Sequence, residues 1–246
     1  MIKKLNLVEN IEKYHLNGIV ESVKWNISNN KLHVDFVSPH QDLVGHVECD
    51  IKLEDSTLGI FNTSSFLKLI NILDADIEVT VEKQHKTPNK LLIEDSNFSL
   101  QYSLADPNII QPSPSISEPE YEIKFNIDSE FIVRFSKAKS ALGSNTKDIF
   151  RIASIINQDG NKEVKLTLGD PTSHSNKIEF TSLAEYEGVP SNNIPFNSSH
   201  VKEILSANKD NWETATGYLS TNGLLKLEFA NETSKSIYYL PELRIG

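Results

Sequence analysis

The chain has 246 residues, a length that suits two domains that each bury a core. Lysine and arginine number 24 against 34 aspartates and glutamates, and the formal net charge of −10 excludes a protein that coats DNA with its whole surface. The single cysteine, Cys49, excludes a disulfide framework or a zinc cluster of several thiolates. With no apolar signal segment and no run of 18 apolar residues, the chain is expected to be soluble and intracellular.

The first half of the chain alternates between apolar and polar residues, which predicts half-buried antiparallel strands. Helical spacing of apolar residues is rarer and predicts short helices. In chain order we expect a weak helix over 7–14, strands over 32–36 and 47–53, a helix over 64–73 and a strand over 77–81.

Residues 105–120 interrupt this pattern. The segment has four prolines, no basic residue and no periodicity, so we interpret it as an extended connector. Two neighbouring isoleucines, Ile109 and Ile110, indicate that part of it lies against a surface. The predicted organisation is a domain over 1–105, a connector over 106–120 and a domain over 121–246.

The second half repeats the first in character. We expect a strand over 121–127, then a helix over 128–142 with Asp128 or Ser129 as N-cap and Gly143 past its end. A strand over 164–168, a helix over 198–207 and a strand over 225–229 follow. Few helices among many strands predict an α+β fold.

The two halves also share sequence motifs. The segment 61–64 (FNTS) opens one predicted helix, and 196–199 (FNSS) opens another 135 positions later. At an offset of 136, the pair 90–91 (KL) matches 226–227, and Tyr102 matches Tyr238. Two matches in order at nearly one offset predict duplicated domains.

The chain contains none of the motifs G-x-x-x-x-G-K-[ST], G-x-G-x-x-G, H-E-x-x-H, G-x-S-x-G or C-x-x-C. Its acidic pairs are typical of solvated turns, so we predict that the protein is not an enzyme and uses no cofactor. The densest group of potential metal ligands is His40, His46, Glu48, Cys49 and Asp50. Strand alternation places Cys49 on the apolar face, away from His46 and Glu48. We therefore predict a buried structural cysteine and no metal site.

The distinctive charge feature is a basic stretch in an acidic protein. Residues 131–151 contain Arg134, Lys137, Lys139, Lys147 and Arg151 against one acidic residue. Basic residues also occur on or beside the other predicted helices: Lys3, Lys4, Lys68, Lys202 and Lys209. Ordinary solvated charge is one interpretation; a local cationic surface that holds a DNA backbone without reading its sequence is the other.

Together these features resemble a DNA sliding clamp, most closely the T-even-like bacteriophage clamps and more distantly proliferating cell nuclear antigen. The segment 66–79 resembles the second helix and following strand of the phage clamp's first domain. The segments 90–99 and 105–107 are similar to that domain's last strands and its exit into the connector. The segment 134–137 (RFSK) resembles the basic first helix of the second domain. The ending 238–241 (YYLP) resembles that of the cellular clamps.

This resemblance implies a homotrimeric ring of six similar domains, with sheets outside and helices lining a hole for duplex DNA. It implies a processivity factor that tethers the replicative DNA polymerase, is loaded by a clamp loader ATPase, and acts in viral DNA replication in the host cytoplasm without a membrane partner. A role with late-transcription machinery is a further expectation, as for some phage clamps.

The resemblance also implies site residues. The expected DNA-binding residues are Lys3, Lys4, Lys68, Arg134, Lys137, Lys139, Lys202 and Lys209. The first helix is shorter and less basic than the family pattern, so Lys13 is not assigned to DNA. The expected partner-peptide pocket comprises Leu43, Ile109, Ile110, Tyr239, Leu240 and Pro241, although core packing explains Leu43 and Leu240 equally well. Strands within 97–104 and 164–168 are expected to pair between subunits.

A non-enzymatic, two-domain β-rich binding module, for example a virion or carbohydrate-binding protein, is the alternative. Such modules usually carry aromatic binding platforms, whereas Trp25 and Trp212 stand isolated in the sequence. The basic helices and the apolar residues in the connector favour the clamp.

Overall fold

The computed structural model describes residues 2–143, 148–169, 176–187 and 193–244. The chain divides into two compact units. The first comprises Met1–Pro114 with Glu232–Ser236, and the second Ser115–Asn231 with Ile237–Gly246. The change from the first unit to the second falls inside the predicted connector, whereas the inclusion of five residues near the C-terminus in the first unit has no signal in the sequence. None of the helices in the described residues is long and apolar enough to span a membrane.

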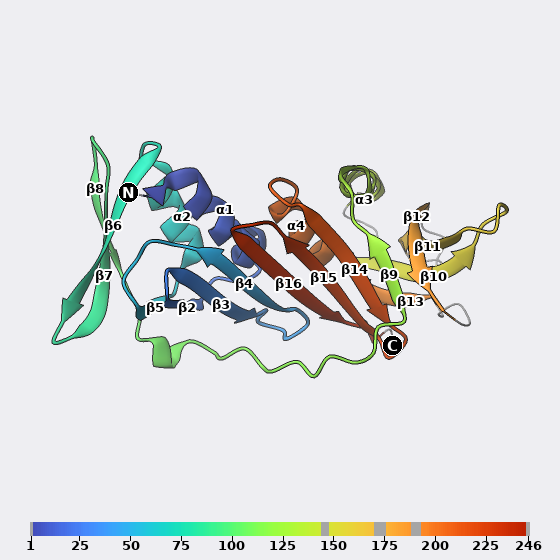
Figure 1. Ribbon diagram of the computed structural model, residues 1–246, viewed down its shortest axis with the longest axis horizontal. Helices are drawn as coiled ribbons and strands as arrows, with labels where there is room; N and C mark the ends of the chain where they lie inside the picture. Colours follow the sequence, from blue (N-terminus) through green and yellow to red (C-terminus); the bar gives the residue numbers. More distant parts are fainter. Residues whose placement is uncertain (1, 144–147, 170–175, 188–192, 245–246) are drawn as a thin grey trace. The chain divides into compact units, whose positions relative to one another are not determined.

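The described residues of the first unit form two helices and eight strands, most of which are labelled in Figure 1. Its strands pair antiparallel in two runs, β1-β6-β7-β8 and β4-β3-β2-β5. The helices α1 and α2 pack against each other, and α1 also packs on β4. In chain order the elements are β1 (Ile2–Lys3), α1 (Lys4–His15), β2 (Val23–Ser28), β3 (Lys31–Val37), β4 (Val44–Asp50), β5 (Ser56–Ile60), α2 (Thr63–Asn71), β6 (Asp76–Gln84), β7 (Thr87–Glu94) and β8 (Ser99–Ser103), with short 3-10 turns at Leu16–Gly18 and Pro107–Ile109.

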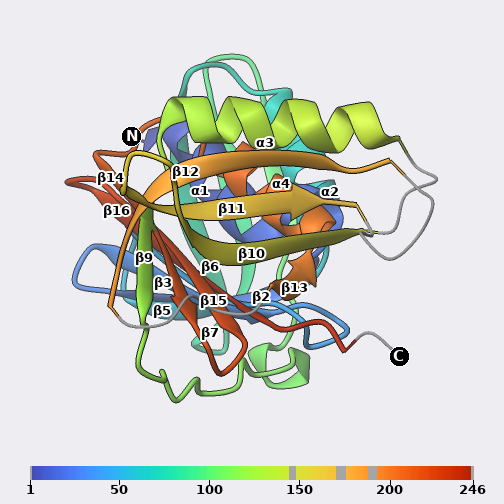
Figure 2. The ribbon, with the colours of Figure 1, turned by 90° about the vertical axis from the view of Figure 1, so that its right-hand side faces the viewer.

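The second unit has the same sequence of elements. Its strands follow the order β13-β10-β11-β12-β9-β14-β15-β16. Helices α3 and α4 pack against each other, and α3 lies along β12 (Figure 2). The elements are β9 (Ile123–Asn126), α3 (Ser129–Leu142), β10 (Ile149–Ile156), β11 (Lys162–Leu168), β12 (Ile178–Tyr186), β13 (Ile194–Asn197), α4 (Ser198–Ala207), β14 (Thr214–Ser220), β15 (Leu224–Ala230) and β16 (Ser234–Pro241), of which the first three residues are counted with the first unit.

Each unit therefore reads strand, helix, four strands, helix, three strands, which confirms the predicted duplication. The strand orders also correspond, because β5-β2-β3-β4 matches β13-β10-β11-β12 and β1-β6-β7-β8 matches β9-β14-β15-β16. In the second unit the two runs are joined where Ala184–Tyr186 of β12 pairs with Phe125–Ile123 of β9.

The repeated Asn motif begins a helix in both units. Asn62 Oδ1 accepts a hydrogen bond from the backbone N–H of Ser65 at 2.8 Å, and Asn197 Oδ1 accepts from Ser199 and His200 at 3.0 and 3.1 Å. These bonds satisfy N–H groups that have no partner within the helix. The helix α3 begins in the same way, with Asp128 Oδ1 accepting from the backbone of Phe131 at 2.6 Å.

Aromatic side chains fill both cores. In the first unit the ring of Phe66 on α2 lies 5.7 Å from Trp25 and 4.5 Å from Tyr102, and the Trp25 indole N–H donates to the Tyr14 hydroxyl at 3.1 Å. In the second unit three rings follow one another from α3 to β13. Phe135 lies 5.4 Å from Phe150, which lies 6.0 Å from Phe196. The core thus holds the apolar face of the helices and leaves the opposite face to polar residues.

Candidate nucleic-acid interface

In the first unit, the predicted DNA-binding lysines differ in solvent exposure and in whether another group binds their ammonium group. Lys68 is exposed on α2, whose apolar face buries Phe66 and Ile70, and Lys68 has no ion-pair partner among the described residues. Lys3 is exposed on β1. Lys4, by contrast, donates from Nζ to the carbonyl oxygen of Leu73 just beyond α2, which fixes its ammonium group inside the unit.

In the second unit, α3 carries three of the predicted residues. Lys137 is exposed and without an ion-pair partner in the part of the chain that the structure describes. Lys139 forms an ion pair with Asp148, and only 14% of its side chain is exposed. Arg134 lies against β12, because its guanidinium donates to the carbonyl of Thr181 at 3.3 Å and sits 5.9 Å from the ring centre of Phe180.

The last two predicted residues lie on and after α4. Lys202 Nζ is 3.3 Å from Glu203 Oε1, so its charge is partly compensated by its neighbour in the sequence. Lys209 follows the C-cap Asn208 and is exposed. Lys147, part of the basic stretch, lies outside the described residues.

Of the eight predicted DNA-binding residues, those without a carbonyl or carboxylate partner among the described residues are Lys3, Lys68, Lys137 and Lys209, two from each unit. Lys4, Arg134, Lys139 and Lys202 already have carbonyl or carboxylate partners, which a sequence does not reveal. Which of the eight contact DNA stays a prediction.

Lys13 on α1 has a structural role. Its side chain is buried and donates from Nζ to Ser234 Oγ at 2.8 Å, with Asn10 Oδ1 at 3.5 Å. Burial lowers the pKa of Lys13 from its ordinary value. Nearby, the backbone N–H of Asp50 donates to the carbonyl of Thr233 at 3.0 Å. Both bonds attach residues 232–236 to the first unit, and they account for a lysine that the family pattern left without a role.

The predicted partner-peptide residues of the first unit are unequally exposed. Leu43 and Ile110 are buried, and Ile110 contacts Gly59, where an added Cβ would lie 3.3 Å from its Cδ1. Ile109 is 66% exposed, at the end of a 3-10 turn capped by the Asp106 carboxylate. Ile109 is therefore the member of this group that offers apolar surface.

The other three pocket residues belong to the second unit. Leu240 is buried, Pro241 is exposed, and the Tyr239 hydroxyl donates to Glu118 Oε1 at 2.5 Å. Whether the six residues form one pocket stays a prediction.

A cluster around Lys226 was not predicted from the sequence. Its Nζ lies 3.0 Å from Glu118 Oε2 and 5.4 to 5.9 Å from the ring centres of Tyr121, Tyr218 and Tyr239. An ammonium surrounded by three ring faces and a carboxylate is a strong anchor. It attaches the end of the predicted connector to β14, β15 and β16.

The strand edges correct one expectation. The segment 164–168 was expected at a subunit interface, but it lies in β11, which pairs with β10 on one side and β12 on the other. Both of its hydrogen-bonding edges are occupied, so it cannot accept another strand. Among the described residues, 178–183 of β12 offer an open edge instead, because only 184–186 of that strand pair with β9. β8, within the expected segment 97–104, pairs with β7 and with no other strand in the described part of the chain.

Comparison with known proteins places the fold. No protein-family model matches the chain. No curated protein matches it either. Among solved structures, A. fulgidus PCNA with the C-terminal region of FEN-1 bound matches with a TM-score of 0.77 and 17% identity, covering 100% of this chain and 98% of that one. The proliferating cellular nuclear antigen of Entamoeba histolytica matches with a TM-score of 0.74 and 18% identity, covering 98% and 96%. From end to end, the chain has the fold of the PCNA-type sliding clamps.

Proposed function

We propose that the protein is a DNA sliding clamp, a homotrimeric ring that encircles duplex DNA and tethers a replicative DNA polymerase as its processivity factor. The observation that carries the proposal is the full-length likeness to PCNA, with both units and every predicted helix in place. The resemblance to T-even-like phage clamps in 61–140 supports a viral member. The role is non-enzymatic, and a clamp loader ATPase places the ring on DNA.

The distribution of charge supports DNA binding without sequence readout. The chain carries a formal charge of −10, yet Lys68, Lys137 and Lys209 are exposed on or beside helices. Lysine binds phosphate as a point charge and reads no base edges. A ring holds DNA by topology, so a few weak phosphate contacts suffice and leave it free to slide.

The edges of two strands support a closed ring. Among the described residues, β8 in the first unit and 178–183 of β12 in the second have no strand partner on one side. Exposed edges invite pairing with another chain, and Leu183 on β12 is 65% exposed. If β8 of one subunit pairs with β12 of its neighbour, the contact is head-to-tail. Such contacts close into a ring when the rotation between neighbouring subunits divides evenly into a full turn. Three subunits of 27.7 kDa would form a ring of about 83 kDa.

Partner binding at the connector completes the proposal. The A. fulgidus protein was solved with the C-terminal region of FEN-1 bound. By analogy, we assign peptide contacts to Ile109, with Leu43, Ile110, Tyr239, Leu240 and Pro241 forming the surrounding wall. The polymerase, the clamp loader and the late-transcription machinery are the candidate partners. Because Ile109 is exposed, Ile109→Asp should abolish binding of the polymerase without unfolding the protein. Normal binding of the polymerase by this variant would contradict the assignment of Ile109.

The test asks whether the protein encircles DNA. It needs no clamp loader, because a ring can thread onto linear DNA over a free end. Linear duplex DNA is fixed to a surface at one end and incubated with the protein, after which the free end is either left open or blocked with a bulky protein. A ring that slides should remain on blocked DNA in a high-salt wash and leave open DNA. Equal retention on open and blocked DNA would refute the ring. Light scattering of the same sample should give the trimer mass; a strict monomer at high concentration would also refute it.

A further inference from the structure

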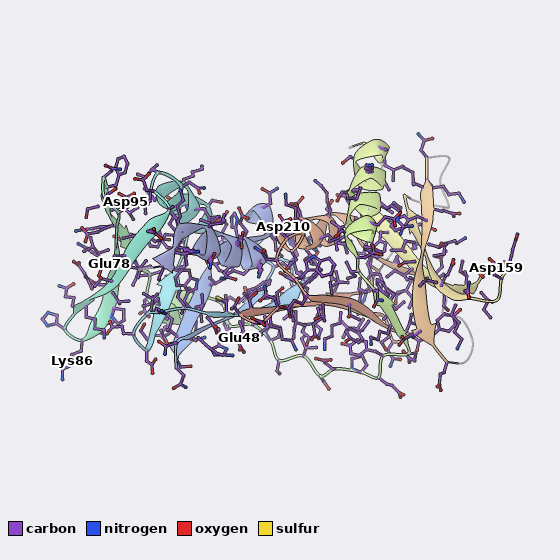
Figure 3. All side chains as sticks on the ribbon, turned by 45° about the horizontal axis from the view of Figure 1, so that its top comes forward. Glu48, Glu78, Lys86, Asp95, Asp159 and Asp210 are labelled. Carbon is purple, nitrogen blue, oxygen red and sulfur yellow. The ribbon has the colours of Figure 1, made fainter. Side chains whose placement is uncertain are left out.

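Four side chains form a polar cluster on the exposed face of β3 and β4. The antiparallel register places His33 directly opposite Glu48 and Asp35 directly opposite His46. Leu32, Val34 and Phe36 on β3, and Val47 and Cys49 on β4, alternate with them and are buried. The cluster therefore combines two imidazoles and two carboxylates on one side of a rigid strand pair; Figure 3 marks Glu48.

The potential ligand atoms of this cluster are close together. One donor atom each from His33, His46 and Glu48 lies within 4.8 Å of the others. About a third of each of these side chains is exposed, so each is accessible yet held by its strand. Ligand atoms of a tetrahedral Zn²⁺ ion with bonds of 2.0–2.1 Å lie about 3.4 Å apart, which small side-chain rotations achieve.

Asp35 fixes the tautomer of His46 in the form that can bind a metal ion. His46 Nδ1 lies 2.7 Å from Asp35 Oδ1, and because an ionised carboxylate only accepts hydrogen bonds, Nδ1 must donate. In the neutral ring this leaves Nε2 with its lone pair, as a metal ligand requires. A carboxylate behind a histidine is the usual arrangement in zinc sites, where it fixes the tautomer and the ring orientation.

Glu48 also has an oxygen available. Its Oε1 pairs with Lys31, whereas Oε2 lies 3.6 Å from His33 Nδ1. A cation bound by Oε2 would leave the Lys31 pair intact. Two imidazoles and one carboxylate, with a remaining position for water, form a donor set that suits Zn²⁺.

We propose that His33, His46 and Glu48 bind a Zn²⁺ ion on the outer face of β3 and β4, with Asp35 as the positioning residue behind His46. The ion would link neighbouring strands by side-chain bonds in addition to the backbone ladder. This site is independent of the DNA-binding proposal, since none of its residues belongs to the helices.

Titration calorimetry of the untagged full-length protein with ZnCl₂ tests the site. We expect one Zn²⁺ per chain. His33→Gln with His46→Gln should abolish this binding, and Asp35→Asn should weaken it roughly 10- to 100-fold. His40→Gln is the matched control, because His40 is exposed in the turn before β4 and belongs to no cluster in the described residues. Circular dichroism should show all variants folded, since every changed position is on the surface or partly exposed.

Co²⁺ provides a second readout, since tetrahedral coordination by imidazole gives intense visible absorption that Zn²⁺ should displace. Absence of saturable Zn²⁺ binding would overturn the proposal. So would equal affinity in wild type and His46→Gln, or an equal loss in the His40→Gln control.

Discussion

Replacing Lys68 and Lys137 with glutamine should reduce the salt dependence of duplex DNA binding while leaving the fold intact. Both lysines are exposed, lie on helices of different units and have no ion-pair partner among the described residues. Each phosphate contact contributes about −0.9 to the slope of log K against log salt. If DNA contacts the pair in one subunit, the slope should fall in magnitude by about 1.8; if it contacts all three pairs of a trimer, by about 5.

Fluorescence anisotropy of a short labelled duplex measures this slope between about 25 and 200 mM NaCl. The matched control is Lys86→Gln with Lys124→Gln, which removes the same charge from one exposed residue of each unit. Lys124 alternates on β9 with Phe125, whose ring lies 5.9 Å from Phe131 of α3, so Lys124 faces away from that helix. The reasoning is refuted if the helix pair leaves the slope unchanged, or if the control pair lowers it equally.

Three further predictions concern stability and reactivity. Gly45→Ala should lower the free energy of unfolding by about 1–3 kcal/mol in urea titrations, because the new Cβ would lie 2.2 Å from Cζ of Phe36; an unchanged midpoint would contradict this close packing. Burial raises the pKa of the Cys49 thiol to about 12, so at pH 8 roughly one thiol in ten thousand is ionised, and a thiol reagent should react only with unfolded protein. Rapid labelling without denaturant would show that Cys49 is accessible. Backbone N–H groups, that of Asp74 foremost, hold the pKa of Asp95 below its usual value. Wild type should therefore exceed Asp95→Asn in urea midpoint above about pH 4, and the difference should vanish as the pH falls through the lowered pKa; a gap that persists in acid would refute this.

The parts of the fold that depend on local chemistry were predictable from the sequence. The residues 198–207 form α4 as expected, and α3 begins after Asp128 and ends before Gly143, because caps and apolar spacing act within a few residues. The duplication was visible because both units use an Asn cap after a Phe. α1 extends three residues further toward the N-terminus than the weak signal over 7–14 indicated.

The parts that depend on register and partner choice were not predictable. The regular alternation of 164–168 marks β11 as a well-buried strand, and such a strand is paired on both sides; the less regular β12 holds the open edge. The residues near His46 in the sequence did not predict a metal site. The second histidine of the proposed site, His33, is distant in the sequence and lies on the adjacent strand. Likewise, a lysine's sequence position does not say whether a carbonyl or carboxylate will meet its flexible side chain, as happens for Lys4 and Lys139.

The attachment of Glu232–Ser236 to the first unit affects how the chain folds during translation. A nascent first unit would have every element from β1 to β8 yet lack the hydroxyl of Ser234 that accepts from the buried Lys13. The ribosome must add residues 115–234 before that partner exists, which takes roughly 6–24 s at 5–20 residues per second. Until then Lys13 keeps its longer contact with Asn10 but lacks the 2.8 Å bond to Ser234, so we expect α1 to be held less firmly. A chain truncated before Ser234 should therefore have a less stable first unit than the 246-residue chain.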